Sequence, residues 1–536
     1  MTDTTMSAAA APRQMPDEER IDPWRVAAFL AMVFGMFMAI LDIQIVSASL
    51  ADIQAGLSAS ADEISWVQTA YLIAEVVMIP LSGFLARALS TRVLFSISAA
   101  GFTLASALCA TAGSIEQMIV YRAIQGFIGG GMIPSVFAAS FTLFPGRQRA
   151  IVTPLIGLVA TIAPTIGPTV GGWLTQAFSW HWLFLVNVFP GIGVTLAAVL
   201  LIDFDEPDLA LLRRFDWFGL AGMAGFLGGL EYVLEEGPNH DWFDERAVLM
   251  CAIVSAVGCV LFFWRAFTAP EPIVDIWAYR DRNFTLGSLF QFVMGVGLYG
   301  LTYLYPVYLA RVRGYDAMMI GETMFVTGIV MFFTAPISGK LSVSMDPRIM
   351  MMIGFGAFAL GTWMVTGLTA EWDFWELFVP QILRGAGLML CMVPITNLAL
   401  GTLPVHELKN ASGLFNLVRN LGGAVGLAVI NTVLNHRMDL HLVRLHERVA
   451  EGRAVAEEML ASMTAQFADY GPGLDQMMAL KRLAALVRRE ALVMAFADVF
   501  VVLTVLFGAL TFAALLLHKP KAAAAPGGPA GGGGGH

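Results

Sequence analysis

The sequence has few charged residues for its length. Of its 536 residues only 13% are Asp, Glu, Lys or Arg, about half the share of an average soluble domain, whereas 57% are apolar. A soluble chain of this size would form several domains with charged surfaces. The composition therefore excludes an ordinary cytosolic enzyme, and the mean hydropathy of +0.71 indicates a chain surrounded largely by lipid.

Cysteine and positive charge are also scarce. The four cysteines lie in apolar runs and form no CxxC pair, so neither a disulfide framework nor a metal site is predicted. The formal net charge of -10 offers no basic surface for nucleic acid, and the absence of a Walker sequence disfavours ATP-driven transport. Methionine is abundant, with 29 copies, which suits either packing in the core and toward lipid or an adaptable apolar cavity.

Long apolar runs dominate the chain. A helix needs about 20 mostly apolar residues to cross a bilayer, because backbone polar groups cannot stay unpaired in hydrocarbon. Fourteen such runs predict an all-α polytopic membrane protein, although the seventh and tenth each contain a Glu. The runs cover residues 26–46, 64–82, 93–112, 117–138, 151–173, 182–202, 216–234, 247–267, 285–307, 317–338, 349–368, 375–397, 411–433 and 492–517.

The distribution of Lys and Arg predicts the orientation of these runs. If the N-terminus is cytoplasmic, the cytoplasmic segments hold 17 Lys and Arg and the short outside loops hold three. Because cytoplasmic loops carry an excess of these residues, both termini are predicted inside.

Residues 434–490 form the one long polar segment between apolar runs. Apolar residues recur at helical spacing from Met438 to Val449 and again from Met477 to Val487, with a turn signal at Gly471-Pro472-Gly473. We predict a helical hairpin on the outer surface. Its apolar stripes either pack on each other or dock a partner.

Two kinds of motif recur about 255–260 residues apart. Gln125-Gly126 in the fourth run and Arg384-Gly385 in the twelfth each precede a Pro, and glycine-rich stretches occur at 167–172 and 422–426. This repetition predicts two similar halves in parallel orientation, a known transporter arrangement.

The motifs also resemble those of a known family, the fourteen-span drug:proton antiporters of the major facilitator superfamily, of the EmrB type. The resemblance extends from about residue 25 to 517. It rests on a first-run motif, an R-x-x-Q-G motif in the fourth run, an antiporter motif in the fifth and a W-x-W motif before the sixth. These are Leu41–Val46, Tyr121–Gly126, Ala163–Gly172 and Trp180–Pro190.

The resemblance implies a division of the chain. Two six-helix bundles are expected, with two additional helices between them. The expected parts are a disordered cytoplasmic N-terminus at 1–24, the first bundle at 25–202, the additional helices and a cytoplasmic linker at 203–284, the second bundle at 285–517 with the periplasmic hairpin 434–490, and a disordered tail at 518–536.

The sequence departs from the family in a cytoplasmic loop motif. After the second run the family usually has G-x-x-x-D-R-x-G-R, whereas this chain runs from Gly83 to Arg92 with Arg87 in place of the acid and Ser90 in place of the later Gly. The departure removes the basis for a carboxylate latch in this loop. Gln44 also replaces a more usual Thr, which alters the polar contacts expected around Asp42.

Charges inside the apolar runs need a reason, because each costs at least about 2.5–3.5 kcal/mol at mid-bilayer. A carboxylate that gains and loses a proton is the minimum machinery for proton coupling. We predict this role for Asp42, with Arg122 nearby stabilising its deprotonated form. The alternative is a fixed Asp–Arg pair that clamps two helices. Glu75 is a second candidate proton site, a binder of cationic substrates, or a packing residue.

Other polar residues are candidate substrate contacts or structural groups. Arg384 and Arg419 are predicted either to bind substrate carboxylates or to cap helix ends at the cytoplasmic face, with the structural role favoured for Arg419. Glu231, Glu322 and Asp498 are predicted to lie near the outer interface. The candidate substrate-binding residues are Gln44, Gln125, Gln381 and Arg384.

The glycine- and proline-rich part of the fifth run has a mechanical interpretation. Glycines allow neighbouring helices to approach closely, and prolines remove backbone donors and kink the helix. Such a helix can open or seal a cavity when two halves rock, or it can be an ordinary kinked helix. The candidate hinge residues are Pro164, Gly167, Pro168, Gly171 and Gly172.

Together, the resemblance and these residues predict an inner-membrane exporter of hydrophobic or amphipathic toxic compounds. It is expected to use the proton gradient and no cofactor, and to have no enzymatic activity. The resemblance also implies a periplasmic adaptor that contacts 434–490 and an outer-membrane channel. The alternatives are a dedicated exporter of a fatty acid, siderophore or secondary metabolite, and a membrane protein that does not transport.

Overall fold

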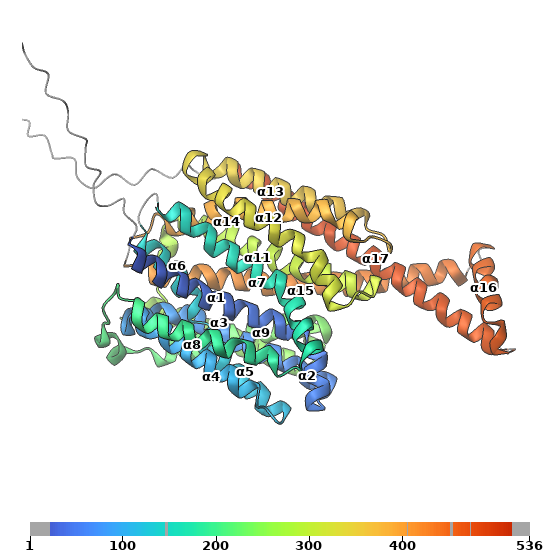
Figure 1. Cartoon of the computed structure of the whole chain (residues 1–536), viewed down its shortest axis with the longest axis horizontal. Coiled ribbons are helices and arrows are strands. Elements are labelled where there is room, and N and C mark those ends of the chain that lie inside the picture. The colour runs from blue at the N-terminus through green and yellow to red at the C-terminus, as the bar shows by residue number, and fades with distance from the viewer. Residues whose placement is uncertain (1–21, 145–147, 405, 451–453, 472, 517–536) are drawn as a thin grey trace, which may run out of the picture.

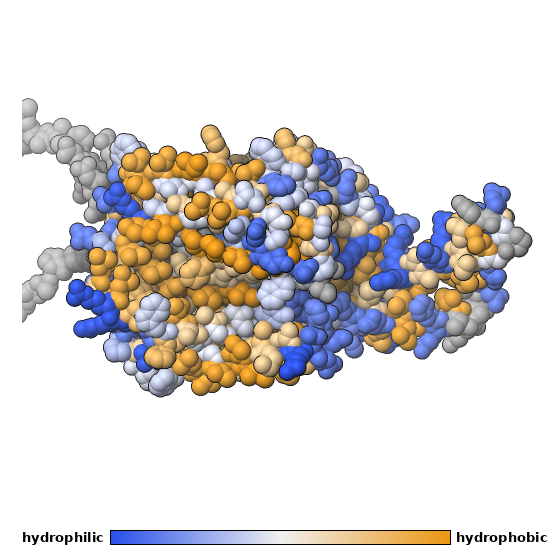
Figure 2. All heavy atoms as spheres, turned by 90° about the horizontal axis from the view of Figure 1, so that it is seen from below, coloured by the Kyte–Doolittle hydropathy of each residue, from blue (hydrophilic) through white to orange (hydrophobic). Residues whose placement is uncertain are grey.

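The computed structural model describes residues 22–144, 148–404, 406–450, 454–471 and 473–516, and all its regular elements are helices. Within these residues, fourteen helices are long and apolar enough to cross a membrane, as the sequence predicted. Figure 2 shows apolar side chains over the body of the molecule and polar side chains toward both ends. The seventh and tenth runs, 216–234 and 317–338, are both helical although each contains a Glu.

Six spans form the first part of the fold. The fourth span is divided into two helices at Gly130-Gly131. The elements are α1 (Pro23–Ala48), α2 (Leu50–Leu57), α3 (Ala61–Leu89), α4 (Thr91–Cys109), α5 (Ile115–Gly129), α6 (Met132–Leu143), α7 (Arg149–Ala177) and α8 (Trp182–Leu201).

Eight more spans follow, two of which are the additional helices. The additional pair is α9 (Trp217–Glu236) and α10 (Arg246–Thr268). The remaining elements are α11 (Arg282–Tyr308), α12 (Ala317–Ser344), α13 (Pro347–Met364), α14 (Phe374–Leu400), α15 (Leu408–Ala450), α16 (Ala454–Gln466) and α17 (Leu474–Ala513).

Capping side chains set several helix starts. Ser60 and Glu63 form a reciprocal capping box at the start of α3, and Asp373 and Glu376 form another at the start of α14. A side-chain oxygen at these positions satisfies backbone N–H groups that have no partner within the helix. Polar residues in the short connections therefore fix where each apolar helix begins.

The same close packing occurs once in each half of the chain. A Cβ at Gly171 of α7 would lie 2.7 Å from the carbonyl oxygen of Ile45 in α1, and a Cβ at Gly426 of α15 would lie 2.9 Å from the Cα of Val296 in α11. Only glycine permits these approaches. The glycine stretches that repeat in the sequence thus make equivalent helix contacts in the two halves.

The additional helices lie at the seam between the halves. Helix α9 packs against α3 on one side and α15 on the other, and α10 packs on α9. Thr69 of α3 donates to Glu236 at 3.2 Å, and the side-chain amide of Asn435 in α15 donates to the carbonyl of Pro238 at 3.1 Å. The end of α9 is therefore hydrogen-bonded to both halves.

The polar segment differs from the predicted two-armed hairpin. Helix α15 continues without a break to Ala450, and the separate helix α16 packs against α17 (Figure 1). Met463 of α16 and Leu483 of α17 are buried in this contact. Gly471 and Gly473 both have φ of 89°, a conformation that favours glycine. We call the end of the molecule with α16 the hairpin face and the opposite end the termini face.

The predicted disordered ends fall mostly outside the described residues. Residues 1–21 and 517–536 are not described, and α1 already begins at Pro23, where Asp22 accepts a hydrogen bond from the backbone N–H of Trp24.

Candidate functional site: a cavity between the halves

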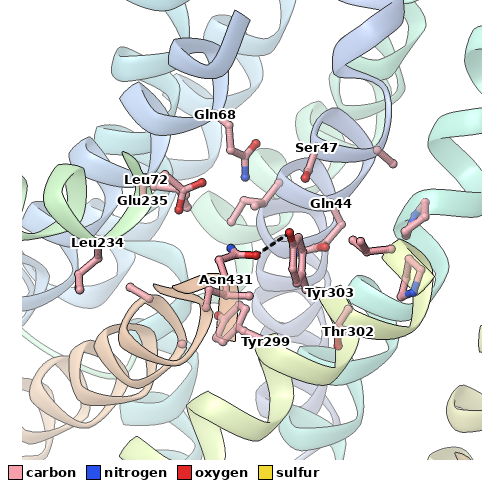
Figure 3. A pocket seen from close by; sticks show the side chains of 18 of the residues that line it. Gln44, Ser47, Gln68, Leu72, Leu234, Glu235, Tyr299, Thr302, Tyr303 and Asn431 are labelled. Carbon is pink, nitrogen blue, oxygen red and sulfur yellow. Dashed lines mark hydrogen bonds between the residues drawn. The ribbon is translucent and has the colours of Figure 1, made fainter. Parts of the chain in front are cut away.

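A cavity of about 740 Å³ lies between the two halves. Its lining comes from α1, α3 and α7 on one side, from α11, α12 and α15 on the other, and from α9 at the seam. The lining residues lie in the parts of these helices nearest the hairpin face. Figure 3 shows a subset of them, including Gln44, Ser47, Gln68, Leu72, Leu234, Glu235, Tyr299, Thr302, Tyr303 and Asn431.

The cavity wall combines aromatic, aliphatic and polar groups. The hydroxyl of Tyr303 donates to Asn431 at 2.8 Å, and that of Tyr299 donates to Asn420 at 3.2 Å. A volume between about 300 and 1,000 Å³ is typical of sites for drug-sized molecules. The wall of this cavity has a large polar share beside its apolar groups. No methionine is among the lining residues described.

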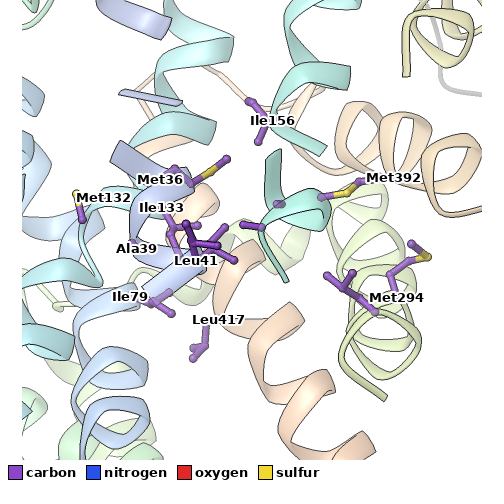
Figure 4. Close-up of a cluster of buried hydrophobic side chains, with 14 of the residues drawn as sticks. Met36, Ala39, Leu41, Ile79, Met132, Ile133, Ile156, Met294, Met392 and Leu417 are labelled. Atoms are coloured by element: carbon purple, nitrogen blue, oxygen red, sulfur yellow. The ribbon is translucent and has the colours of Figure 1, made fainter. Parts of the chain in front are cut away.

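The methionines instead contribute to the packed core. Figure 4 shows Met36, Met132, Met294 and Met392 within a cluster of buried apolar side chains. A Cβ at Gly157 of α7 would lie 3.2 Å from the sulfur of Met392, so the two halves touch through this side chain. Of the two interpretations of the abundant methionines, packing in the core therefore agrees with the structure better than an adaptable cavity wall does.

Asp42 and Arg122 are in direct contact and fully buried. The Nη1 atom of Arg122 lies 2.6 Å from Oδ2 of Asp42, and both side chains have an exposed fraction of 0%. Gln125 donates to Oδ1 of Asp42 at 3.1 Å, and Asn187 of α8 donates to the same oxygen at 2.7 Å. Every oxygen of this carboxylate is therefore hydrogen-bonded to α5 or α8.

Further contacts hold Arg122 in place. Its Nε donates to the carbonyl of Val67 at 3.2 Å, and its guanidinium carbon lies 4.2 Å from the ring centroid of Tyr71. Neither Asp42 nor Arg122 lines the cavity. In this conformation the pair has the geometry of the helix clamp that the sequence left open as the alternative to proton exchange.

Glu75 occupies a different environment. It lines the cavity with an exposed fraction of 3%, and its Oε1 has no hydrogen-bond partner among the described residues. The cations whose charges act on it are Arg419 and Arg122. Of the three predicted proton-site residues, Glu75 alone is in the cavity.

Arg419 differs from its predicted place at a helix end. It is 2% exposed within α15, its guanidinium lies 5.7 Å from the ring centroid of Phe137, and its Nε and Nη1 have no partner among the described residues. A buried cation of this kind needs a nearby negative charge. Glu75 supplies one.

One of the four candidate substrate residues lines the cavity, namely Gln44. Gln125 lies in the Asp42 network, and Gln381 accepts from Thr327 at 3.0 Å and donates to the carbonyl of Thr323 at 2.8 Å. The Nη2 atom of Arg384 donates to Thr302 at 2.8 Å. Gln381 and Arg384 are buried in helix contacts, and Arg384 reaches the cavity only through Thr302.

Two acids in α9 were missed or misplaced by sequence reasoning. Glu231, predicted near the outer interface, is 7% exposed and lines the cavity, and so does Glu235, which was not singled out. Their spacing of four places them on one helix face, but the sequence gives no sign that this face adjoins a cavity.

The other two acids predicted near the outer interface also have defined surroundings. Asp498 of α17 contacts Arg437 at 2.6 Å and His441 at 2.7 Å, both on α15, so it joins two helices near the hairpin face. Glu322 is exposed on the outside of α12.

At the cavity rim, Tyr315 donates a hydrogen bond of 2.5 Å to Asp373, which caps α14. This hydrogen bond, together with the nearby Arg313, holds the pKa of the Asp373 carboxyl below its usual value. The contact joins the connection between α11 and α12 to the start of α14. It is strongest above the ordinary pKa of an aspartate, because protonation of Asp373 would weaken it.

Comparison with known proteins agrees with this architecture. The family model described as Major Facilitator Superfamily matches residues 32–427. The chain is 43% identical to the "Colistin resistance protein EmrB" of Acinetobacter baumannii over 92% of its own length and 96% of that protein. The chain is an EmrB-type member of the major facilitator superfamily.

Two further comparisons extend over similar lengths. The "Multidrug export protein EmrB" of Escherichia coli is 29% identical over 88% of this chain and 91% of that protein. The structure of the proton:xylose symporter XylE aligns with a TM-score of 0.56 at 10% identity, covering 92% of this chain and 97% of that one, which shows the shared fold. Superfamily membership makes the chain a transporter and not an enzyme, and its fourteen apolar helices make it a multi-pass bacterial inner-membrane protein.

The candidate hinge residues of this EmrB-type protein lie where α7 contacts two helices. Gly167 and Gly171 face α1, where added Cβ atoms would meet Gln44 and Ile45. On another face, Thr169 of α7 lies against Gly321 of α12, in the other half of the fold. Pro168 lines the cavity, Pro164 and Gly172 are buried, and both prolines lie inside the helix. This proline-containing helix therefore contacts both its own bundle and the opposite one.

At the termini face a carboxylate latch is present despite the altered loop motif. The acid is Asp205, from the connection after α8, which forms an ion pair with Lys409 of α15 and accepts from the N–H and hydroxyl of Thr91, both at 2.7 Å. Lys409 also donates to the carbonyl of Ala86 at 3.0 Å. The latch uses Asp205, which lies outside the loop motif, and the position of the usual loop acid is still occupied by Arg87.

The remaining loop residues have separate places. Gly83 packs directly on the start of α15, since a Cβ there would lie 2.9 Å from the Cα of Asn410. The guanidinium of Arg87 lies 5.8 Å from the ring centroid of Phe84, and Arg92 is exposed.

We expect Asp205→Asn to loosen the termini face. The substitution removes a half-buried charge pair between the halves. Loss of such an interaction should change the equilibrium between the closed and open contact by roughly tenfold. Amide hydrogen exchange should become roughly tenfold faster in the first turns of α15 and around residues 83–92. Asp208→Asn, at an exposed site nearby, should leave exchange unchanged. Equal exchange in the two variants would contradict a latch at Asp205.

Proposed function

We propose that this protein is a proton-driven exporter of hydrophobic and amphipathic toxic compounds that works by alternating access. The observation that carries the proposal is a drug-sized cavity between the halves whose wall includes Glu75, a buried carboxylate with one oxygen that has no hydrogen-bond partner in the described part of the chain. We place both termini in the cytoplasm. The hairpin face is then periplasmic, and the structure corresponds to the outward-facing state, with the latch closed at the cytoplasmic face.

In this scheme Glu75 carries the proton. When the cavity faces the periplasm, Glu75 takes up a proton and substrate leaves. Protonation removes the negative charge of Glu75 from the cavity and so removes its electrostatic attraction to Arg419 and Arg122. After the halves rock, Glu75 releases the proton to the cytoplasm and a new substrate enters. The inward proton flow therefore supplies the free energy for outward transport.

Asp42 has a supporting role in this proposal. Its carboxylate neutralises Arg122 and joins α1 to α5 and α8 through three hydrogen-bonding partners. The first half must be rigid, so that the two halves rock as bodies and open the opposite face without local deformation of the helices. We therefore assign proton exchange to Glu75 and the clamp to Asp42 and Arg122.

We further propose that the extended helices at the hairpin face dock a periplasmic adaptor that leads to an outer-membrane channel. The contact between α16 and α17 leaves Met477 62% exposed, Leu480 49% exposed and Leu474 48% exposed. These three residues begin α17 and form an apolar surface that a helical partner can cover.

The test of proton coupling is transport in proteoliposomes with an imposed pH gradient. An amphipathic fluorescent dye should accumulate on the side opposite to the proton flow, and a protonophore should abolish the accumulation. Empty liposomes with the same gradient are the control for dye that partitions passively. Equal dye movement with and without the gradient would reject proton-driven export.

A further inference from the structure

The unusual feature of the cavity is that one wall belongs to the additional helices. Glu231, Leu234, Glu235 and Asn239, from α9 and the turn that follows it, all line the cavity. The spacings of three, four and eight residues from Glu231 put them on one helix face. Helix α9 therefore contributes side chains to the cavity in addition to packing against α3 and α15.

The acids of α9 fall into two groups. Glu236 has partners, since it accepts from Thr69 at 3.2 Å and lies 3.6 Å from His240. Glu231 and Glu235 form no ion pair or hydrogen bond within the described part of the chain. Glu236 joins α9 to α3 through its hydrogen bond. Glu231 and Glu235 make no contact of this kind among the described residues.

The cavity carries an excess of negative charge. Its lining includes the carboxylates of Glu75, Glu231 and Glu235, whereas the lining cation is Arg311, which is exposed at the end of α11. Oε1 of Glu75, itself 3% exposed, has no partner in the described residues. Glu75 and Glu231 are buried and Glu235 is half-buried. Carboxylates removed from water without partners are costly, and a bound positive charge offsets that cost.

The rest of the cavity wall suits a ligand that carries a positive charge on an apolar or aromatic body. Tyr299 and Tyr303 offer aromatic faces, which attract cations, and Leu72, Val76 and Leu427 offer apolar surface. We propose that Glu231 and Glu235 of α9, together with Glu75, recognise the positive group of an amphipathic organic cation. This substrate class rests on the proposed export function, which it makes more specific.

The test uses two probes of the same shape and opposite charge. Tetraphenylphosphonium and tetraphenylborate are titrated by equilibrium dialysis against the purified full-length protein in detergent. The wild-type protein should bind the cation more tightly than the anion. The double variant Glu231→Gln/Glu235→Gln should lose roughly tenfold in affinity for the cation, because two charged contacts become neutral, and its affinity for the anion should not fall.

The matched control is Glu245→Gln, which removes a carboxylate that is exposed just before α10. It should bind the cation as the wild type does, and melting curves should show that all variants are folded. Tighter or equal binding of tetraphenylborate by the wild type would overturn the proposal. So would unchanged cation affinity in the double variant.

The same proteins in proteoliposomes separate this inference from the export proposal. If driven export is present but cation affinity is unchanged in the double variant, the role of α9 is rejected and export stands. If cation affinity depends on Glu231 and Glu235 while no gradient-driven transport occurs, the binding site stands and export is rejected.

Discussion

Replacing Glu75 by Gln should abolish proton-driven transport while the protein remains folded. Gln has nearly the same shape and can still form hydrogen bonds, but it cannot take up or release a proton in this pH range. In proteoliposomes with an imposed pH gradient, dye accumulation by Glu75→Gln should fall to the level of empty liposomes. Because Oε1 of Glu75 has no hydrogen-bond partner among the described residues and no ion pair in direct contact, the substitution breaks no hydrogen bond. It removes only the charge that acts on Arg419 at longer range, so the melting temperature should fall by much less than in Asp42→Asn.

Glu322→Gln is the matched control for this experiment. It removes a carboxylate within another membrane-spanning helix, but Glu322 is exposed on the outside of α12 and does not line the cavity. Its driven transport should equal that of the wild type. Undiminished accumulation in Glu75→Gln would show that another group carries the proton.

Replacing Asp42 by Asn should destabilise the protein strongly. Arg122 would then be a buried cation with an exposed fraction of 0% and no negative partner in contact. Removing one partner of a buried ion pair typically costs about 3–5 kcal/mol in unfolding free energy. Thermal unfolding of the purified protein in detergent, followed by tryptophan fluorescence, should show a clear decrease in melting temperature.

Two further variants test whether the clamp explains this loss. Asp52→Asn removes an exposed acid in α2 and should change the unfolding free energy by less than about 0.5 kcal/mol. Adding Arg122→Gln to Asp42→Asn removes the unpaired cation and should recover part of the stability. A melting temperature of Asp42→Asn equal to that of the wild type would contradict the clamp.

Hydropathy alone predicted the fourteen spans, because length and apolar content decide whether a helix can cross the bilayer. The proximity of Asp42 and Arg122 could also be predicted, because the motifs that contain these residues resemble those of a known family. Motifs of small residues identify helices that pack closely. Gly167 and Gly171, for example, allow α7 to pack closely against α1.

The cavity wall could not be predicted in the same way. Near the end of a span, an acid such as Glu231 has the sequence pattern of an interfacial residue, and only the position of α9 against α3 and α15 turns it toward the cavity. That position depends on contacts between helices distant in sequence. Asp205 and Lys409 lie 204 residues apart, and neither belongs to a motif that indicates their pairing.

The position of α9 also restricts the routes by which a lipid-dissolved compound can arrive. On the flank where α3 meets α15, α9 is hydrogen-bonded to both neighbours and α10 covers it from the bilayer side. Sideways entry from the acyl chains is therefore blocked there in this conformation. Compounds that partition into the membrane must therefore reach the cavity by a route other than this flank.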